Sequence, residues 1–235
     1  MKLNGSKRRR MNGLDRLSVY LLTDRELAPG GDVTAVVAAA LQAGIRAVQY
    51  REKELSTGDQ YRQGQILAEL VSQAGGWLIV NDRIDIALAV GAAGVHLGQT
   101  DLPLPIARRL GGAELIIGIS VDTVAQAQQA EREGADYLGV GAIFPTATKP
   151  EAPVLGLARL AEITRAVSIP VIAIGGITCD RLQPLAAAGA DGIAVVSAVM
   201  AAPDPFQAAA QLLVNWTAGG REGNECGCRK SGNLD

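Results

Sequence analysis

Residues 171–177 read Val-Ile-Ala-Ile-Gly-Gly-Ile, an apolar run that stops at a pair of glycines. No polar residue interrupts its first four positions, which is typical of a strand buried on both faces in a parallel sheet. Other short runs rich in β-branched residues lead us to predict eight strands in all, at 17–22, 45–50, 77–80, 94–97, 115–119, 137–140, 171–174 and 193–196. Alanine-rich stretches with apolar residues at helical spacing lie between these runs, so strands and helices alternate along the chain.

The ends of four predicted helices repeat one short pattern of alanine and glycine that leads directly into a strand. The pattern begins at Gly44, Gly91, Gly134 and Gly189. Glycine readily takes the left-handed conformation that ends a helix, so these positions mark helix C-termini. Eight strands with intervening helices in about 200 residues predict a single (β/α)8 TIM barrel of the α/β class. An open doubly wound sheet is the alternative, but the segment Thr23-Asp24-Arg25 lacks the glycine-rich nucleotide motif that such a sheet needs after its first strand.

The composition narrows the class of function. The chain has 235 residues, of which 48% are hydrophobic, 20% charged and 3% aromatic, and its net charge is −2. A globular protein of this kind offers neither the basic surface nor the stacking side chains that nucleic-acid binding requires. A single histidine, His96, excludes a histidine-rich zinc site, and three cysteines in a chain of this length indicate a reducing compartment. Since no run of about 18 uncharged apolar residues occurs, we expect no membrane span and a cytoplasmic protein.

Two end segments differ from the rest of the chain. The first is basic and resembles the start of a signal peptide at Lys7-Arg8-Arg9-Arg10, but charged residues interrupt the apolar stretch that should follow. The last contains Gly219-Gly220 and has no apolar periodicity. We therefore expect a flexible tail at 1–16, a barrel domain at 17–216 and a second short flexible tail at 217–235.

Polar residues or glycines follow seven of the predicted strands. In a barrel, the carboxyl ends of the strands together form the mouth that holds the active site. The residues at these ends are Gln49, Arg51 and Lys53; Asn81 and Asp82; Gln99 and Asp101; Ser120; Thr146, Thr148 and Lys149; Gly175 and Gly176; and Ser197. Each is a weak signal alone because loops are generally polar, but together they predict a polar mouth.

The charged members of this set indicate a phosphorylated substrate with a metal ion. Asp82 and Asp101 follow neighbouring strands and offer the hard oxygen ligands with which Mg²⁺ is held beside a phosphate. A helix N-cap for Asp82 and a turn for Asp101 are the structural alternatives. Arg51, Lys53 and Lys149 are cations at the same mouth, although ordinary surface charge would also explain them.

The glycine pair 175–176 and the dipeptide Val196-Ser197 lie where barrels commonly bind phosphate through bare backbone N–H groups. A tight turn that requires glycine is the alternative. The loop 144–154 is long enough to close over the mouth as a lid, or it is only an excursion from the barrel. His96 lies inside an apolar run and is expected to be a hydrogen-bonded barrel residue.

Taken together, these segments resemble the thiamine-phosphate synthase family, also called thiamine-phosphate pyrophosphorylase. The matching segments occur in order between residues 17 and 213, namely Gln49–Lys53, Asn81–Arg83, Gly94–Gln99 with Asp101, Gly118–Ser120, Asp136–Gly141 with Phe144–Lys149, Ala173–Ile177 and Val195–Ser197. The resemblance implies a TIM-barrel transferase of vitamin B1 synthesis. It would join 4-amino-5-hydroxymethyl-2-methylpyrimidine diphosphate to a thiazole phosphate (carboxylate) and give thiamine phosphate, diphosphate and CO₂ by a dissociative substitution.

The resemblance also implies roles for individual residues. Mg²⁺ is the implied cofactor, with Asp82 and Asp101 as its ligands. The implied contacts of the pyrimidine diphosphate are Gln49, Arg51, Lys53, Asn81, Ser120 and Lys149. Those of the thiazole phosphate are Thr146, Thr148, Gly176, Val196 and Ser197. Tyr50, Glu52 and Ala147 are further implied substrate contacts. The implied catalytic residues are Ser120, Lys149 and Arg51. Alternation along the strand end is expected to turn Glu52 in a different direction from its neighbours.

Three other functions compete with this one. A thiazole tautomerase shares the fold but moves a proton, so it needs a positioned base and no Mg²⁺. A catalytically silent homologue would bind the same small molecules without turnover. Another phosphate-binding barrel isomerase would leave Asp82, Asp101 and Lys149 unexplained as a group. We expect small-molecule substrates, no nucleic acid and no membrane as partners, and the sequence favours neither a monomer nor a homo-oligomer.

Overall fold

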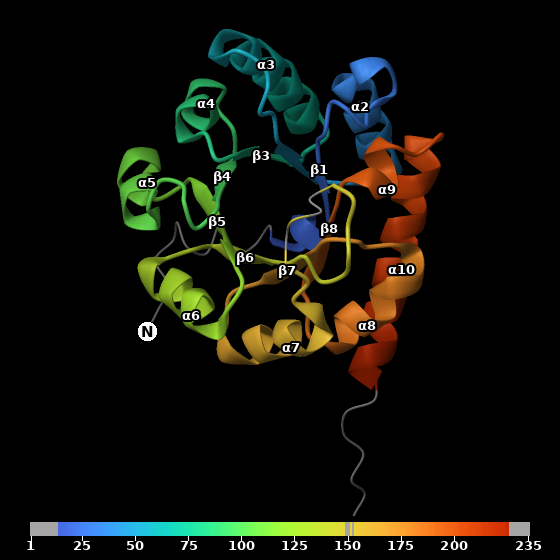
Figure 1. The fold of residues 1–235 in the computed structure, drawn as a ribbon. Helices are drawn as coiled ribbons and strands as arrows, with labels where there is room; N and C mark the ends of the chain where they lie inside the picture. Colours follow the sequence, from blue (N-terminus) through green and yellow to red (C-terminus); the bar gives the residue numbers. More distant parts are fainter. Residues whose placement is uncertain (1–13, 149–150, 152, 226–235) are drawn as a thin grey trace, which may run out of the picture.

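The computed structural model describes residues 14–148, 151 and 153–225, with side chains up to Thr217. Eight parallel strands form one closed barrel in chain order (Figure 1). They are β1 (Val19–Leu22), β2 (Ala47–Tyr50), β3 (Trp77–Asn81), β4 (Gly94–Leu97), β5 (Ile116–Val121), β6 (Tyr137–Val140), β7 (Val171–Ile174) and β8 (Gly192–Val195). β8 pairs with β1, with Ile193 opposite Val19, and this pairing closes the barrel. The predicted fold, a single (β/α)8 TIM barrel, is confirmed.

The helices form a ring outside the strands (Figure 1). They are α2 (Val33–Ala43), α3 (Thr57–Gln73), α4 (Ile84–Ala89), α5 (Leu104–Gly111), α6 (Val124–Glu133), α7 (Gly156–Ala166), α8 (Leu182–Ala187), α9 (Ser197–Met200) and α10 (Pro205–Glu225), with 3₁₀ turns η1 (Leu14–Ser18), η2 (Pro29–Gly31) and η3 (Cys179–Arg181). The predicted helix ends at Gly44 and Gly134 are confirmed, because both residues are left-handed C-caps. Among the described residues, no helix is both long and apolar enough to cross a bilayer.

The start of the first strand differs from the prediction, and the last helix is longer than its apolar residues indicate. The first strand was expected from residue 17, but it begins at Val19. Leu17 belongs to the turn η1 before this strand, where its side chain is fully buried. α10 passes the expected boundary at 216 and ends at Glu225. Ala209, Leu212 and Trp216 are buried and anchor this helix, and helix propagation from an anchored segment needs no apolar stripe of its own.

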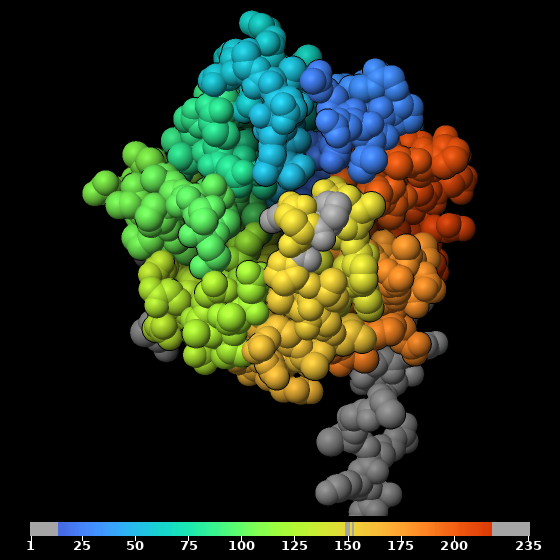
Figure 2. Space-filling view, viewed as in Figure 1, coloured from blue at the N-terminus to red at the C-terminus, as the bar shows by residue number. Residues whose placement is uncertain are grey.

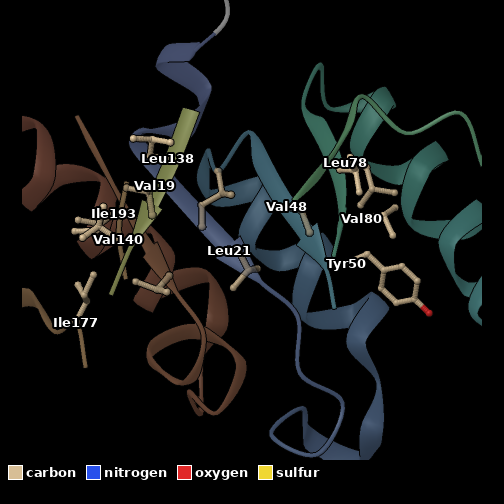
Figure 3. Close-up of a cluster of buried hydrophobic side chains, with 14 of the residues drawn as sticks. Val19, Leu21, Val48, Tyr50, Leu78, Val80, Leu138, Val140, Ile177 and Ile193 are labelled. Carbon is tan, nitrogen blue, oxygen red and sulfur yellow. The ribbon is translucent and has the colours of Figure 1, made fainter. Parts of the chain in front are cut away.

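Side chains of each strand alternate between two buried layers. Val48 and Tyr50 of β2 point outward into the layer between the strands and the helices, which Figure 3 shows with neighbours such as Leu78 and Val80. Ala47 points into the interior of the barrel instead. Because side chains of a strand have a period of two, Gln49 shares the interior with Ala47. This alternation decides which side chains of each strand can reach the mouth.

Candidate active site

A cavity of about 510 Å³ lies at the carboxyl ends of the strands. Figure 2 shows this face, with the yellow segment that follows β6 lying over its middle. The predicted site residues that line the cavity are Gln49, Arg51, Lys53, Asn81, Asp82, Asp101, Ser120, Thr146, Thr148, Gly176, Val196 and Ser197. Lys149 lies outside the described residues. The structure therefore brings most of the predicted set around one space.

Three predicted substrate contacts, Tyr50, Glu52 and Ala147, do not line this cavity. Tyr50 points into the strand–helix layer, where its hydroxyl group is buried without a hydrogen-bond partner. The Glu52 carboxylate accepts hydrogen bonds from the backbone N–H groups of Glu54 (2.8 Å) and Leu55 (3.3 Å), so it shapes the loop before α3. Ala147 is absent from the lining, although its neighbours on both sides contribute. Strand alternation explains Tyr50, and it agrees with the different direction expected for Glu52.

Arg51 is held at the mouth by the end of the neighbouring strand. Its backbone N–H donates to the Thr23 hydroxyl oxygen at 3.0 Å, and that hydroxyl donates back to the Arg51 carbonyl at 3.2 Å. The Arg51 guanidinium lies 4.0 Å from the Asp24 carboxylate and also lines the cavity. Thr23 and Asp24 thus contact Arg51 at the mouth, and neither was predicted as a site residue.

Asp82 and Asp101 lie together in the cavity wall. Burial and the neighbouring Asp101 carboxyl group raise the pKa of Asp82 to about 6, against the opposing effect of Lys53 and Arg51. Asp101 Oδ2 also accepts a hydrogen bond from the Gly98 backbone N–H at 2.6 Å. The N-cap alternative for Asp82 is wrong, because α4 has no side-chain cap. A raised pKa of this origin marks a place where a bound cation would relieve repulsion between carboxylates.

The donor set of this pair suits magnesium. The described residues contain no group of three or more histidine, cysteine, aspartate or glutamate side chains that could enclose a metal ion. Mg²⁺ needs fewer protein ligands than that, because it commonly keeps several waters and completes its shell with substrate phosphate. Two adjacent carboxylates beside an open cavity therefore fit Mg²⁺, and Arg51 and Lys53 line the same cavity as partners for phosphate oxygens.

A chain of hydrogen bonds forms the floor of the cavity. It runs from Gln49 through Tyr20, Tyr137 and His96 to Ser120, with every link between 2.9 and 3.0 Å. Burial lowers the pKa of His96 to about 4, so the ring is neutral at neutral pH. The expectation of a hydrogen-bonded barrel histidine is confirmed. Tyr20 and Tyr137 were missed, although each is a polar residue within a predicted strand.

The glycine pair after β7 faces the segment that follows β6. Both glycines have positive φ, and a Cβ on Gly176 would lie 2.5 Å from the Pro145 carbonyl oxygen. Arg181, which the sequence analysis missed, donates a hydrogen bond to the Gly176 carbonyl at 2.5 Å. Its guanidinium carbon lies 4.8 Å from the centre of the Phe144 ring. Glycine is therefore needed here for close approach of two backbones, in addition to any contact with phosphate.

Comparison with known proteins identifies the family. The model of a family described as thiamine monophosphate synthase matches residues 19–199. The chain belongs to this family. The thiamine-phosphate synthase of Chloroflexus aurantiacus is 51% identical over 195 residues, which cover 83% of this chain and 90% of that protein. The thiamine-phosphate synthase of Haloquadratum walsbyi is 49% identical over 199 residues, which cover 83% of this chain and 89% of that protein.

A solved structure of the same kind supports the family at the level of the fold. The thiamine phosphate pyrophosphorylase from Pyrococcus furiosus is 41% identical and superimposes with a TM-score of 0.81, covering 87% of this chain and 98% of its own. The predicted function, thiamine-phosphate synthase, and the predicted class of enzyme, a transferase, are thus confirmed. All residues that line the cavity, from Tyr20 to Ala198, lie within the part that matches the thiamine monophosphate synthase family.

Proposed function

We propose that this cavity joins 4-amino-5-hydroxymethyl-2-methylpyrimidine diphosphate to a thiazole phosphate by a dissociative substitution that Mg²⁺ assists. The bond between the pyrimidine methylene carbon and the diphosphate oxygen breaks first, and diphosphate leaves with the electron pair. The thiazole nitrogen then donates its lone pair to the methylene cation and forms the new C–N bond. A carboxylated thiazole loses CO₂, and thiamine phosphate is the product.

The single observation that carries this proposal is the separation of charge within one cavity. Asp82 and Asp101 share one part of the wall with Arg51 and Lys53, whereas hydroxyl groups and glycines line the part after β6, β7 and β8. A site for two substrates, of which one leaves a highly charged diphosphate, requires such a division. A tautomerase needs one positioned base, so it does not account for a second carboxylate together with two cations at the same part of the wall.

Several residues would stabilise the departing diphosphate. Asp82 and Asp101 would hold Mg²⁺, which supplies charge neutralisation for the leaving group when bound. Arg51 and Lys53 line the same cavity and would contact phosphate oxygens directly, as would the Ser120 hydroxyl. We also assign Lys149 to this task on the strength of the family resemblance. Gln49 and Asn81, which also line the cavity, would hold the pyrimidine ring.

The thiazole phosphate would lie on the opposite wall. Thr146, Thr148, Gly176, Val196 and Ser197 line this part of the cavity. The Thr146 hydroxyl accepts a hydrogen bond from the Thr148 backbone N–H at 3.3 Å, which gives this stretch a defined turn. Holding the two substrates face to face supplies much of the rate enhancement, and a loop over the mouth excludes water that would capture the cation.

The test is direct. Purified protein is incubated with both substrates in the presence of Mg²⁺ or of EDTA, and the product is dephosphorylated and oxidised to fluorescent thiochrome. We expect a signal with Mg²⁺ and a strongly reduced signal with EDTA. Folded protein that gives no thiochrome with Mg²⁺ would overturn the proposal and favour a silent homologue, while proton exchange on the thiazole alone would favour a tautomerase.

A further inference from the structure

The hydrogen-bonded floor of the cavity is built from five different strands. Gln49 of β2 donates to the Tyr20 hydroxyl of β1 at 2.9 Å, and Tyr20 lies 3.0 Å from the Tyr137 hydroxyl of β6. The Tyr137 hydroxyl lies 2.9 Å from Nδ1 of His96 in β4, and Nε2 of the same ring lies 2.9 Å from the Ser120 hydroxyl of β5. Only Ser120, at the end of this chain of bonds, is half-exposed.

The number of protons in this chain of bonds fixes its direction. The amide nitrogen of Gln49 can only donate, so the Tyr20 oxygen accepts from it. Among the described residues, Tyr137 is the other hydrogen-bond partner of the buried Tyr20 hydroxyl, so the Tyr20 proton is satisfied only when it points to Tyr137. The Tyr137 proton then points to Nδ1 of His96. A neutral imidazole that accepts at Nδ1 carries its proton on Nε2, which donates to the Ser120 oxygen. The Ser120 proton has no place left in the chain of bonds and turns into the cavity.

We infer that His96 is a positioning residue that, as the Nε2–H tautomer, turns the Ser120 hydroxyl proton toward the cavity. The site then presents a donor to the oxygens of an anionic leaving group. If the hydrogen bonds ran in the opposite direction, Ser120 would donate its proton to His96. Its oxygen would then present only lone pairs to the oxygens of the leaving group. The inference rests on the proposed function only for the role of Ser120 toward diphosphate.

Two glycines provide independent support for a fixed position of the ring. A Cβ at Gly118 would lie 2.5 Å from His96 Nδ1 and would also overlap the Tyr137 ring. A Cβ at Gly139 would lie 3.0 Å from His96 Cε1. The neighbouring strands therefore leave space for the imidazole and its bond to Tyr137, and this space disappears with any larger residue.

The tautomer can be measured without any substrate. The chain contains one histidine, so untagged protein labelled with ¹⁵N-histidine gives the nitrogen signals of a single imidazole. We expect a protonated Nε2 and a bare Nδ1 that persist from pH 6 to pH 8. A protonated Nδ1, or an imidazolium in this range, would overturn the inference. The result does not depend on turnover, so it separates failure of this inference from failure of the proposed function.

Kinetics test the connection to Ser120. His96→Gln keeps an N–H donor near the position of Nε2, whereas His96→Leu removes it. We expect His96→Leu to lower kcat about tenfold, His96→Gln to lower it less, and His96→Leu to add little to Ser120→Ala. An equal loss in both backgrounds, or equal losses for Gln and Leu, would contradict a role through Ser120. The exposed Tyr61→Phe serves as the control, and thermal unfolding shows whether each variant is folded. If His96→Leu does not fold, the tautomer measurement decides alone.

Discussion

The guanidinium group of Arg181 covers the ring of Phe144, with 4.8 Å between the guanidinium carbon and the ring centre. The same side chain donates to the Gly176 carbonyl oxygen. Arg181 ends the turn η3, whereas Phe144 lies near the start of the loop between β6 and α7. One side chain thus ties the root of that loop to the glycine pair in the proposed thiazole-phosphate wall.

Replacement of Arg181 by methionine removes both contacts. A cation–π contact contributes about 0.5–2 kcal/mol and a charged hydrogen bond about 1.5–3 kcal/mol, so we expect the KM for thiazole phosphate to rise about tenfold or more. The KM for the pyrimidine diphosphate should change little. Steady-state kinetics with each substrate varied in turn measure both values. Arg159→Met, at an exposed ion pair of α7, is the matched control. Equal increases in both KM values would contradict this localised role.

Asp82→Asn tests the metal site. The substitution keeps the size of the side chain and removes one of two adjacent carboxylates, so we expect the Mg²⁺ concentration for half-maximal activity to rise at least about tenfold. A magnesium titration of the thiochrome signal measures it. Asp85→Asn is the control, because the Asp85 carboxylate pairs with Arg83 at the exposed start of α4. An unchanged magnesium requirement in Asp82→Asn would remove this residue from the proposed site.

Tyr50→Phe distinguishes the observed structure from the sequence-based expectation. The Tyr50 hydroxyl is buried without a partner, and an unsatisfied buried group costs about 1–3 kcal/mol. We therefore expect the free energy of unfolding in urea to stay the same or to increase, with kcat and both KM values unchanged. A substantial increase of the KM for pyrimidine diphosphate would restore Tyr50 as a substrate contact.

Most of the barrel could be predicted because its strands are continuous apolar runs. Three strands, β4, β6 and β7, have the predicted bounds. Of the four predicted glycine caps, Gly44 and Gly134 are C-caps, whereas Val90 and Ala188 cap α4 and α8 just before Gly91 and Gly189. The first strand was placed too early because an apolar Leu17 in a 3₁₀ turn looks like strand in the sequence. The cytoplasmic location and the division into a barrel and two tails stay predictions.

The location of the site could be predicted from the sequence, but not every residue that lines it. The alternation of side chains along each strand explains this difference. Reading the polar residues after each strand located the cavity, but a contiguous motif such as residues 49–53 hides the fact that neighbouring side chains face opposite layers. Arg181 could not be found because its aromatic partner, Phe144, lies 37 residues earlier in the sequence. Tyr20 and Tyr137 could have been found by applying the period of two to every polar residue within a strand.

His96 makes the stability of the fold depend on pH in a definite direction. Burial lowers its pKa to about 4 in the folded chain, whereas an exposed histidine titrates at 6.5. Between these values the unfolded chain binds a proton that the folded chain does not, so the histidine's contribution to stability falls as the pH falls. One pKa unit corresponds to about 1.4 kcal/mol, which gives a total loss of about 3 kcal/mol.

Asp82 acts in the opposite direction over the same pH range. Its pKa is raised from 3.8 to about 6, so without magnesium the folded chain binds this proton first and gains stability as the pH falls. The two effects offset each other in a simple pH scan of the wild-type protein. His96→Gln keeps Asp82 and lacks the histidine, so the difference in unfolding free energy between the two proteins isolates His96. We expect this difference to change by about 3 kcal/mol between pH 7 and pH 4, measured by urea denaturation in EDTA. A constant difference would mean that His96 is not buried as a neutral ring.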